Sequence, residues 1–169
     1  MKGDENMLVA LRKILTVGSV SLLAVFGGTA TASAQSNPPP NGAWVHMHNE
    51  ATTRCIDDSD FKFRTNDCNN SFNQTWAVAQ YSDGSYRFEN MSTFRCIDDS
   101  DFGFRTNICN NSVYQRWAYI INSTDPSAYA LKNLGTGRCI DDSDFGFRTN
   151  TCNLTAYQTF FDTPYTNAP

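Results

Sequence analysis

Three short acidic segments carry the side chains that could do chemistry in this sequence. Each reads Arg-Cys-Ile-Asp-Asp-Ser-Asp-Phe and continues, after one intervening residue, with Phe-Arg-Thr-Asn. After one more intervening residue it ends at a second cysteine. A carboxylate can accept two hydroxyl hydrogen bonds, and an amide can both donate and accept, which suits the diol of a sugar. We therefore predict that each segment displays a carboxylate, an amide and a guanidinium able to bind carbohydrate.

The segments belong to a unit that occurs three times. The copies run from Arg54 to Cys68, from Arg95 to Cys109 and from Arg138 to Cys152. Each copy also has an asparagine six residues before its first cysteine and a Gln-x-aromatic triplet after its second. The spacing between successive copies is typical of repeat architectures. We predict one pseudo-symmetric domain over residues 43–165, with repeats at about 43–81, 82–123 and 124–165.

Short β-strands must position these segments. Turn-forming residues punctuate apolar runs such as 43–46, 86–88 and 117–121, and no stretch sustains a helical apolar period. The sequence therefore predicts an all-β, barrel-like fold.

The stretch between the two cysteines of each copy is predicted to be a hairpin. If the two cysteines of the first copy face each other, Asp57 lies opposite Asn66. Arg64 then lies opposite Ser59, and all four side chains share the disulfide side. Ile56 points the other way, toward the core. The same sorting applies to the other two copies.

The six cysteines allow fifteen disulfide connectivities. Pairing within each copy is the only scheme that is local and treats the three copies alike, and a secreted context permits it. We therefore predict the disulfides Cys55–Cys68, Cys96–Cys109 and Cys139–Cys152. Zinc would need clustered Cys-x-x-Cys or Cys/His spacing, which the sequence lacks.

The pattern Asn-x-x-Thr-x-Arg-Cys-Ile-Asp, a second cysteine and then Gln-x-Trp resembles the ricin B-type (R-type) lectin β-trefoil, a family also counted as carbohydrate-binding module family 13. The resemblance covers about residues 43–165. It implies a barrel capped by hairpins, with one disulfide per repeat and a shallow pocket in each, often for galactose-type or xylose-type sugars. Such a pocket uses the aspartate after the first cysteine, an aromatic platform two residues before the second, and Asn-Gln ahead of the tryptophan.

The resemblance assigns carbohydrate-binding roles residue by residue. The aspartates are Asp57, Asp98 and Asp141, and the glutamines are Gln74, Gln115 and Gln158. The preceding asparagine is Asn73 in the first copy, whereas Tyr114 and Tyr157 replace it elsewhere. Asn66, Asn107 and Asn150 stand where the family carries its platform aromatic. The first copy, which alone keeps Asn-Gln, is expected to be the best site.

The aromatic residues and the glutamines leave alternatives open. Phe61, Phe102 and Phe145 at the hairpin tips supply an apolar surface to a ligand, tuck into the core or pack against a neighbouring repeat. Trp76, Trp117 and Phe160 are expected to be core pillars. The three glutamines either hold the backbone in place or contact the ligand.

The first 34 residues are predicted to be a signal peptide. Arg12 and Lys13 precede an apolar run, and Ala32-Ser33-Ala34 offers the small residues that a signal peptidase accepts. Residues 35–42, with three prolines, are expected to form a stiff, exposed lead-in, and residues 166–169 a tail. The sequence therefore predicts a secreted protein without a membrane span.

Composition limits the partners further. The 169 residues carry a net charge of −4 with scattered basic residues, which gives no support for nucleic-acid binding. The acidic tetrads could offer oxygen ligands to Ca²⁺, but they lack the glycine and closing glutamate of an EF-hand loop. The alternative is a turn capped by aspartates and an arginine. His46 and His48 occur in one copy only, so no metal site is predicted.

The sequence arranges no nucleophile beside a base, because the disulfides claim every cysteine. Composition alone leaves a glycosidase open, but three equivalent shallow sites do not make one deep catalytic cleft. The prediction is a secreted, monomeric, non-catalytic β-trefoil without a cofactor that binds glycans through up to three weak sites. The alternative is a protein-interaction module, such as an inhibitor or a toxin-associated subunit, that uses the same surface.

Overall fold

A computed structural model describes residues 38–165, so the predicted signal peptide at 1–34 and the tail at 166–169 lie outside the described residues. The elements are β1 (Trp44–Asn49), β2 (Cys55–Asp58), β3 (Phe63–Asn66), η1 (Phe72–Gln74), β4 (Trp76–Gln80), β5 (Tyr86–Asn90), β6 (Arg95–Ser100), β7 (Gly103–Ile108), η2 (Val113–Gln115), β8 (Trp117–Ile121), β9 (Tyr129–Asn133), β10 (Arg138–Ser143), β11 (Gly146–Thr151) and β12 (Phe160–Pro164). Within residues 38–165, no helix has the length and apolar character needed to cross a membrane.

Six of these strands form a closed antiparallel barrel. β1 pairs with β4, β4 with β5, β5 with β8, β8 with β9, β9 with β12, and β12 returns to β1. Each barrel strand is thus paired with two others, although β5–β8 and β9–β12 are joined by one residue pair each. Strands of the first and third repeats meet where β1 pairs with β12, so the ends of the domain close the barrel.

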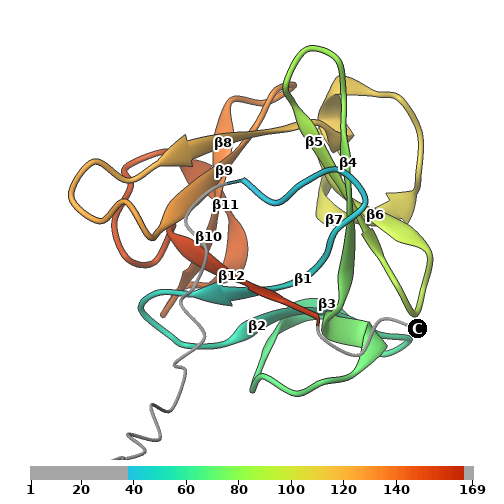
Figure 1. Ribbon diagram of the computed structural model, residues 1–169, viewed down its shortest axis with the longest axis horizontal. Coiled ribbons are helices and arrows are strands. Elements are labelled where there is room, and N and C mark those ends of the chain that lie inside the picture. Colours follow the sequence, from blue (N-terminus) through green and yellow to red (C-terminus); the bar gives the residue numbers. More distant parts are fainter. Residues whose placement is uncertain (1–37, 166–169) are drawn as a thin grey trace, which may run out of the picture. The chain divides into compact units, whose positions relative to one another are not determined.

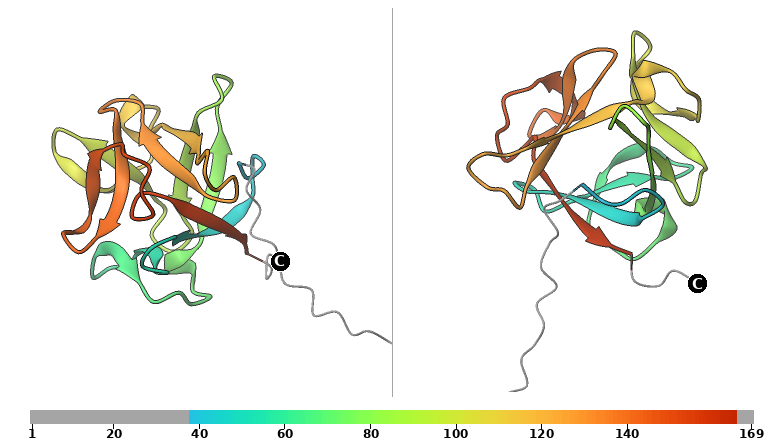
Figure 2. Two further views of the ribbon diagram at one scale, coloured as in Figure 1. Left: turned by 90° about the vertical axis from the view of Figure 1, so that its left-hand side faces the viewer. Right: turned by 45° about the horizontal axis from the view of Figure 1, so that its top comes forward.

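The other six strands form three hairpins, β2–β3, β6–β7 and β10–β11, one in each repeat. Each hairpin joins the barrel through its first strand, β2 to β1, β6 to β5 and β10 to β9. Figure 1 shows the hairpins spaced around the barrel, and the side view in Figure 2 places them at one end of it. This arrangement confirms the predicted all-β, β-trefoil fold.

The core fills the barrel and the space beneath the hairpins. Trp76, Trp117 and Phe160 are fully buried, which confirms them as core pillars. The indole N–H of Trp76 on β4 donates to the carbonyl of Ile56 on β2 at 3.0 Å. This bond joins the barrel to the hairpin of the same repeat. Trp117 makes the corresponding bond in the second repeat.

One phenylalanine from each hairpin points inward to the pseudo-threefold axis. The rings of Phe63, Phe104 and Phe147 pack edge to face, with centroids 4.9–5.0 Å apart. Edge-to-face contacts of this kind add to the stabilisation from burial alone. The three hairpins are therefore joined to one another through this triangle of rings.

A buried aspartate joins each repeat to the next. Asp58 accepts hydrogen bonds from Thr93, Arg95 and Thr106 of the second repeat. Asp99 accepts the same set from Thr136, Arg138 and Thr149 of the third, and Asp142 from Thr52, Arg54 and Thr65 of the first. The contacts run around the domain and close on themselves. This ring explains why the second aspartate, the arginine and the two threonines recur in every copy.

The hairpin register differs by two residues from the predicted one. Cys55 lies opposite Asn66, and Asp57 lies opposite Arg64 instead of Asn66. The prediction placed Cys68 on the ladder, but β3 ends at Asn66 and the disulfide closes from the loop beyond it. A shift of two residues keeps every side chain on its face. The predicted sharing of one face by these polar residues is therefore unchanged.

The three predicted disulfides are present, each closing the same sequence separation of 13 residues. The described part of the predicted lead-in, residues 38–42, is exposed at Pro40, Asn41 and Gly42, as expected, but not at Pro38 and Pro39. Pro39 is buried, and the backbone N–H of Gly42 donates to the carbonyl of Val78 at 2.8 Å. The side chain of Asn41 accepts from the backbone N–H of Gln80 at 2.9 Å. The lead-in therefore packs against the first barrel hairpin.

Candidate functional site

The first aspartate of each acidic tetrad lies in the middle of its hairpin, directly opposite an arginine. The pairs are Asp57–Arg64, Asp98–Arg105 and Asp141–Arg148, with Nε–Oδ1 distances of 3.5, 3.8 and 3.3 Å. All three aspartates are buried, whereas the arginine side chains are 41–42% exposed. The carboxylate therefore anchors the arginine, and the guanidinium is the charged group that a ligand meets first.

The glutamine of each Gln-x-aromatic triplet lies beneath this aspartate. Gln158 is fully buried and donates through Nε2 to Asp141 at 3.3 Å and to the carbonyl of Thr151 at 3.0 Å. Its side-chain oxygen accepts from the backbone N–H of Asn153 at 2.8 Å. The equivalent contacts hold Gln74 and Gln115. Because the amide is used inside the protein, the glutamine holds the aspartate and the following loop in place.

The third repeat has a hollow of about 310 Å³ beside its Asp–Arg pair. Two predicted site residues, Asp141 and Asn150, line it together with Arg148. The rings of Phe145 and Tyr157 line it as well. Polar side chains beside aromatic residues are the combination that a sugar needs, since the hydroxyls require hydrogen bonds and the C–H face of the ring requires an apolar surface.

The hairpin-tip phenylalanines are directed outward. Phe61, Phe102 and Phe145 are 92%, 82% and 81% exposed, so the alternative that they tuck into the core is wrong. The guanidinium of Arg148 lies 5.1 Å from the centroid of the Phe145 ring. Arg105 lies over Phe102 in the same way at 5.3 Å. This stacking holds the arginine and the ring together at the edge of the hairpin.

The acidic tetrad does not converge on one point. Asp57 and Asp58 are successive residues of β2, so their side chains lie on opposite faces. Asp57 contacts Gln74 and Arg64, Asp58 belongs to the ring between repeats, and Asp60 is exposed. Their carboxylates therefore cannot bind one Ca²⁺ together. The alternative of a turn held by aspartates and an arginine fits these contacts better.

The structure brings the predicted aspartate and glutamine of each repeat into contact, and it leaves the predicted asparagines partly exposed. Asn66, Asn73, Asn107 and Asn150 are all half-buried. The prediction gave Tyr157 no role in binding, although the replacement of asparagine by tyrosine before the glutamine was visible in the sequence. The backbone carbonyl of Tyr157 accepts from Asn49 of the first repeat at 2.9 Å, which holds the loop that carries its ring.

Solved structures with the same architecture place the chain among the β-trefoil proteins. The designed threefold symmetric protein ThreeFoil matches with a TM-score of 0.64 at 12% identity, over 71% of this chain and 97% of that one. A Macrolepiota procera ricin B-like lectin in complex with lactose matches with a TM-score of 0.63 at 14% identity, over 75% and 98%. SeviL bound to asialo-GM1 saccharide matches with a TM-score of 0.62 at 13% identity, over 72% and 97%.

The sequence itself defines the family. The profile described as "Ricin-type beta-trefoil lectin domain-like" matches residues 73–157, which is half of the chain. The chain therefore belongs to this family, as its resemblance to ricin B-type lectins predicted. No curated protein matches the sequence.

Proposed function

We propose that the protein is a secreted, monomeric, non-catalytic lectin that binds glycans through its repeats. The observation that carries this proposal is the hollow of the third repeat, which Arg148 and Asn150 line together with Phe145 and Tyr157. Membership of a lectin-like family supports the same conclusion. The two structural neighbours in complex with saccharides carry the same fold. Their sequence identities to this chain are low, so the likeness supports the fold alone.

The geometry favours the third repeat as the best site, whereas the sequence favoured the first because it keeps Asn73. Tyr157 lines the hollow of the third repeat and adds a ring where the first repeat has an amide. Asp141 is held on three sides, by Gln158, by Arg148 and by the hydroxyl of Ser143 at 2.7 Å. A preorganised polar group loses little freedom when a ligand binds.

Up to three sites on one domain suit a polymeric or clustered glycan. The Asp–Arg–Gln arrangement recurs in each repeat, so weak sites at separate hairpins could engage one polymer together. Linked sites raise the apparent affinity far beyond that of any single site. We expect weak binding of a monosaccharide and much tighter binding of a polysaccharide.

A glycan array probed with the oxidised protein, in calcium and in EDTA, tests the proposal. We expect calcium-independent binding to a defined class of sugar. Tyr157→Ala should weaken that binding, whereas Ile121→Ala, a change at an exposed apolar residue on the barrel, should not. Absence of binding by folded protein, or equal binding by the two variants, would contradict the proposed site. Binding that disappears in EDTA would point instead to a metal-dependent site.

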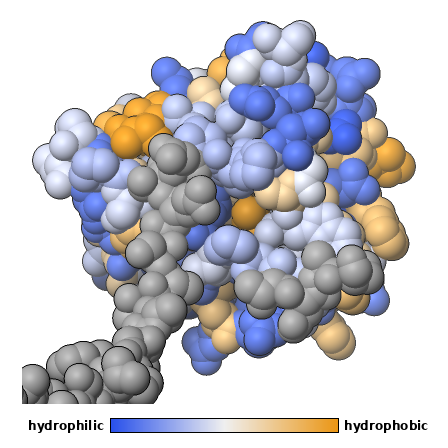
Figure 3. All heavy atoms as spheres, in the orientation of Figure 1, coloured by the Kyte–Doolittle hydropathy of each residue, from blue (hydrophilic) through white to orange (hydrophobic). Residues whose placement is uncertain are grey.

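A second candidate function, protein interaction, is favoured by an apolar pair on the second repeat. Phe94 and Ile108 are 66% and 79% exposed and lie at adjacent ends of β6 and β7. Phe94 adopts a φ of 55°, a conformation that costs energy for a bulky residue, where the third repeat has Gly137. On the face drawn in Figure 3, hydrophobic residues form small separate patches among hydrophilic ones.

Replacing the pair with the third repeat's residues, Phe94→Gly and Ile108→Thr, tests the second candidate. If the second repeat binds a protein, the double variant loses a partner that wild-type protein retains from host extract in the presence of competing sugars. Retention by both proteins, or by neither, would contradict it.

A further inference from the structure

One residue distinguishes the surroundings of the three disulfides. The residue paired with the first cysteine of each hairpin is His48 in the first repeat, Glu89 in the second and Lys132 in the third. The hairpins are otherwise almost identical in sequence. Each repeat therefore offers the same pair of sulfur atoms to a different ionisable side chain, and only the first offers an imidazole.

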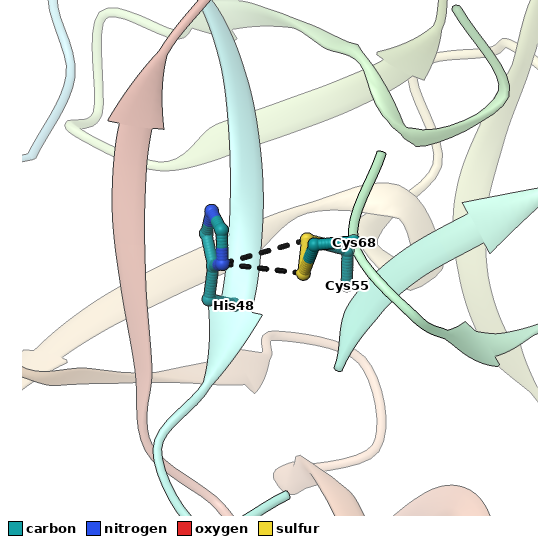
Figure 4. Close-up of side chains that lie close together, drawn as sticks. All are labelled: His48, Cys55 and Cys68. Atoms are coloured by element: carbon teal, nitrogen blue, oxygen red, sulfur yellow. Dashed lines mark hydrogen bonds between the residues drawn. A yellow bond between two sulfur atoms is a disulfide. The ribbon is translucent and has the colours of Figure 1, made fainter. Parts of the chain in front are cut away.

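The imidazole of His48 faces the disulfide directly. Its Nδ1 lies 3.2 Å from Sγ of Cys68 and 3.5 Å from Sγ of Cys55, as Figure 4 shows. Its other nitrogen, Nε2, lies 2.7 Å from the hydroxyl of Thr163 on β12. One nitrogen and two sulfurs thus converge from β1, β2 and the loop after β3, and a neighbouring strand fixes the orientation of the ring.

These distances match those of a zinc site. With Zn–S bonds of about 2.3 Å and Zn–N bonds of about 2.0–2.1 Å, tetrahedral geometry separates a nitrogen from a sulfur by about 3.6 Å. The two N···S distances are already close to this value. Only the sulfurs would have to separate, and breaking the bond between them allows that. A histidine ligand usually donates its second N–H to an oxygen, and the Thr163 hydroxyl can accept it.

We propose that the first repeat contains a redox-gated metal site, in which His48, Cys55 and Cys68 bind one Zn²⁺ after the disulfide between the two cysteines is reduced. The reductant is a dithiol: it supplies two electrons and two protons, becomes a disulfide itself and leaves two cysteine thiols. Zn²⁺ then displaces both thiol protons, and the metal is held by two thiolates and Nδ1 of His48. Water takes the fourth position.

Access suits this sequence of steps. Cys68 is exposed while Cys55 is fully buried, so a thiol can attack the Cys68 sulfur. His46, two residues before His48, lies against Thr75 and is separate from this cluster.

The second repeat provides the natural comparison. The carboxylate of Glu89 lies within 4.8 Å of the sulfurs of Cys96 and Cys109. This carboxylate is also paired with Arg87 at 3.9 Å, which competes with a metal for the carboxylate. The third repeat offers Lys132, whose side chain is not among the Cys, His, Asp and Glu ligands that bind zinc in proteins. We therefore assign the site to the first repeat alone.

Co²⁺ titration of the full chain, oxidised and then reduced with a phosphine, tests the proposal. The reduced protein should bind one Co²⁺ with the absorption bands of tetrahedral thiolate coordination, Zn²⁺ should displace it, and the oxidised protein should bind none. His48→Lys places the third repeat's residue in the first. Loss of a second-shell partner already weakens metal binding about 10–100-fold, so this variant should lose at least about 100-fold.

Three further variants separate this site from general thiol binding. Thr163→Val should weaken binding about 10–100-fold, because it removes the partner of Nε2. Glu89→Gln should change nothing. Lys132→His should create a weaker second site in the third repeat, because Ile120 stands there where the first repeat has Thr163, and should raise the stoichiometry at saturating metal to two. Equal affinities of wild type and His48→Lys, or one metal per chain in Lys132→His at saturating metal, would overturn the proposal.

If reduction partly unfolds the protein, circular dichroism provides a second test of the proposal. In that event Zn²⁺ should restore the spectrum of the wild type but not that of His48→Lys, whose folding is checked in the oxidised state. Failure of Zn²⁺ to restore the wild type, or equal restoration of both, would also overturn the proposal.

Discussion

Asp142 of the third repeat accepts both prongs of the Arg54 guanidinium of the first, Nη2 to Oδ1 at 2.7 Å and Nε to Oδ2 at 3.2 Å. The carboxylate is completely buried, while the arginine is partly exposed. This contact joins the two ends of the domain, 88 residues apart in sequence. Asp142 thus joins the third repeat to the first, just as Asp58 joins the first to the second and Asp99 joins the second to the third.

Asp142→Asn should destabilise the domain strongly. The change removes the charge that holds Arg54 and disturbs the bonds from Thr52 and Thr65. Charge-assisted hydrogen bonds to a buried group are costly to break, so we expect a loss of about 3 kcal/mol in the free energy of unfolding. Urea denaturation measures it. Asp144→Asn, at an exposed position of the same tetrad, serves as the control and should lie within about 0.5 kcal/mol of the wild type.

Phe145→Ala should weaken glycan binding without affecting stability. The ring is 81% exposed, so its removal leaves no cavity in the core. Loss of an aromatic stacking partner is worth about 0.5–1.5 kcal/mol, which corresponds to an affinity about two- to twelvefold lower. Calorimetric titration with the best sugar from the array measures the change. Unchanged affinity would remove Phe145 from the proposed site.

Asp162 should make stability depend on pH in an unusual direction. It is buried in β12 and accepts hydrogen bonds from the hydroxyls of Tyr119 and Tyr129. Burial raises the pKa of Asp162 from 3.8 to about 7, although both hydrogen bonds act to lower it. The folded state therefore binds a proton more tightly than the unfolded state. The resulting stabilisation is complete below pH 3.8 and disappears as the pH rises through 7.

Comparison with Asp162→Asn isolates this contribution from that of other carboxylates. A pKa rise from 3.8 to about 7 corresponds to roughly 4 kcal/mol. Relative to the variant, the wild type should lose roughly this amount between pH 4 and pH 8, with little further change above. Urea denaturation at a series of pH values measures the difference. A difference that is flat across this range would show that the pKa of Asp162 is not raised.

Replacing both Cys139 and Cys152 with alanine should cost about 3 kcal/mol of unfolding free energy. The loop that this disulfide closes has a sequence separation of 13 residues, and loops of this length lose that much entropy in the chain-entropy model. The other two disulfides close equal loops, so their removal should cost about the same. Thermal and urea unfolding of the three double variants measure the costs. Unequal costs would point to the different neighbours, His48, Glu89 and Lys132.

The repeated unit and the alternation of side chains along each strand predicted much of the fold and the disulfide pairing of this protein. The threefold repeat led to one pseudo-symmetric domain and to the pairing of cysteines, because a repeated local spacing has one symmetrical solution. The resemblance to ricin B-type lectins supplied the β-trefoil. The facing of Ile56 and Asp57 to opposite sides followed from the two-residue period of a strand. The register of the hairpin did not follow, because the cysteine pair of each copy is closed from a loop and therefore does not report which residues lie opposite each other.

The candidate site, like the fold, was predicted only in part from the sequence. Its aspartate and glutamine were visible as recurring residues, but their burial was not, since burial depends on which side chains cover them. The sequence alone established the repeats, the disulfides and the polar cluster of each hairpin, because these depend on local spacing and on period. The folded chain decided that Asp58, Asp99 and Asp142 join neighbouring repeats, that Tyr157 lines the hollow, and that His48 faces a disulfide. The aspartate contacts join residues far apart in the sequence, and the other contacts join side chains of different strands and loops, so no local pattern in the sequence encodes them.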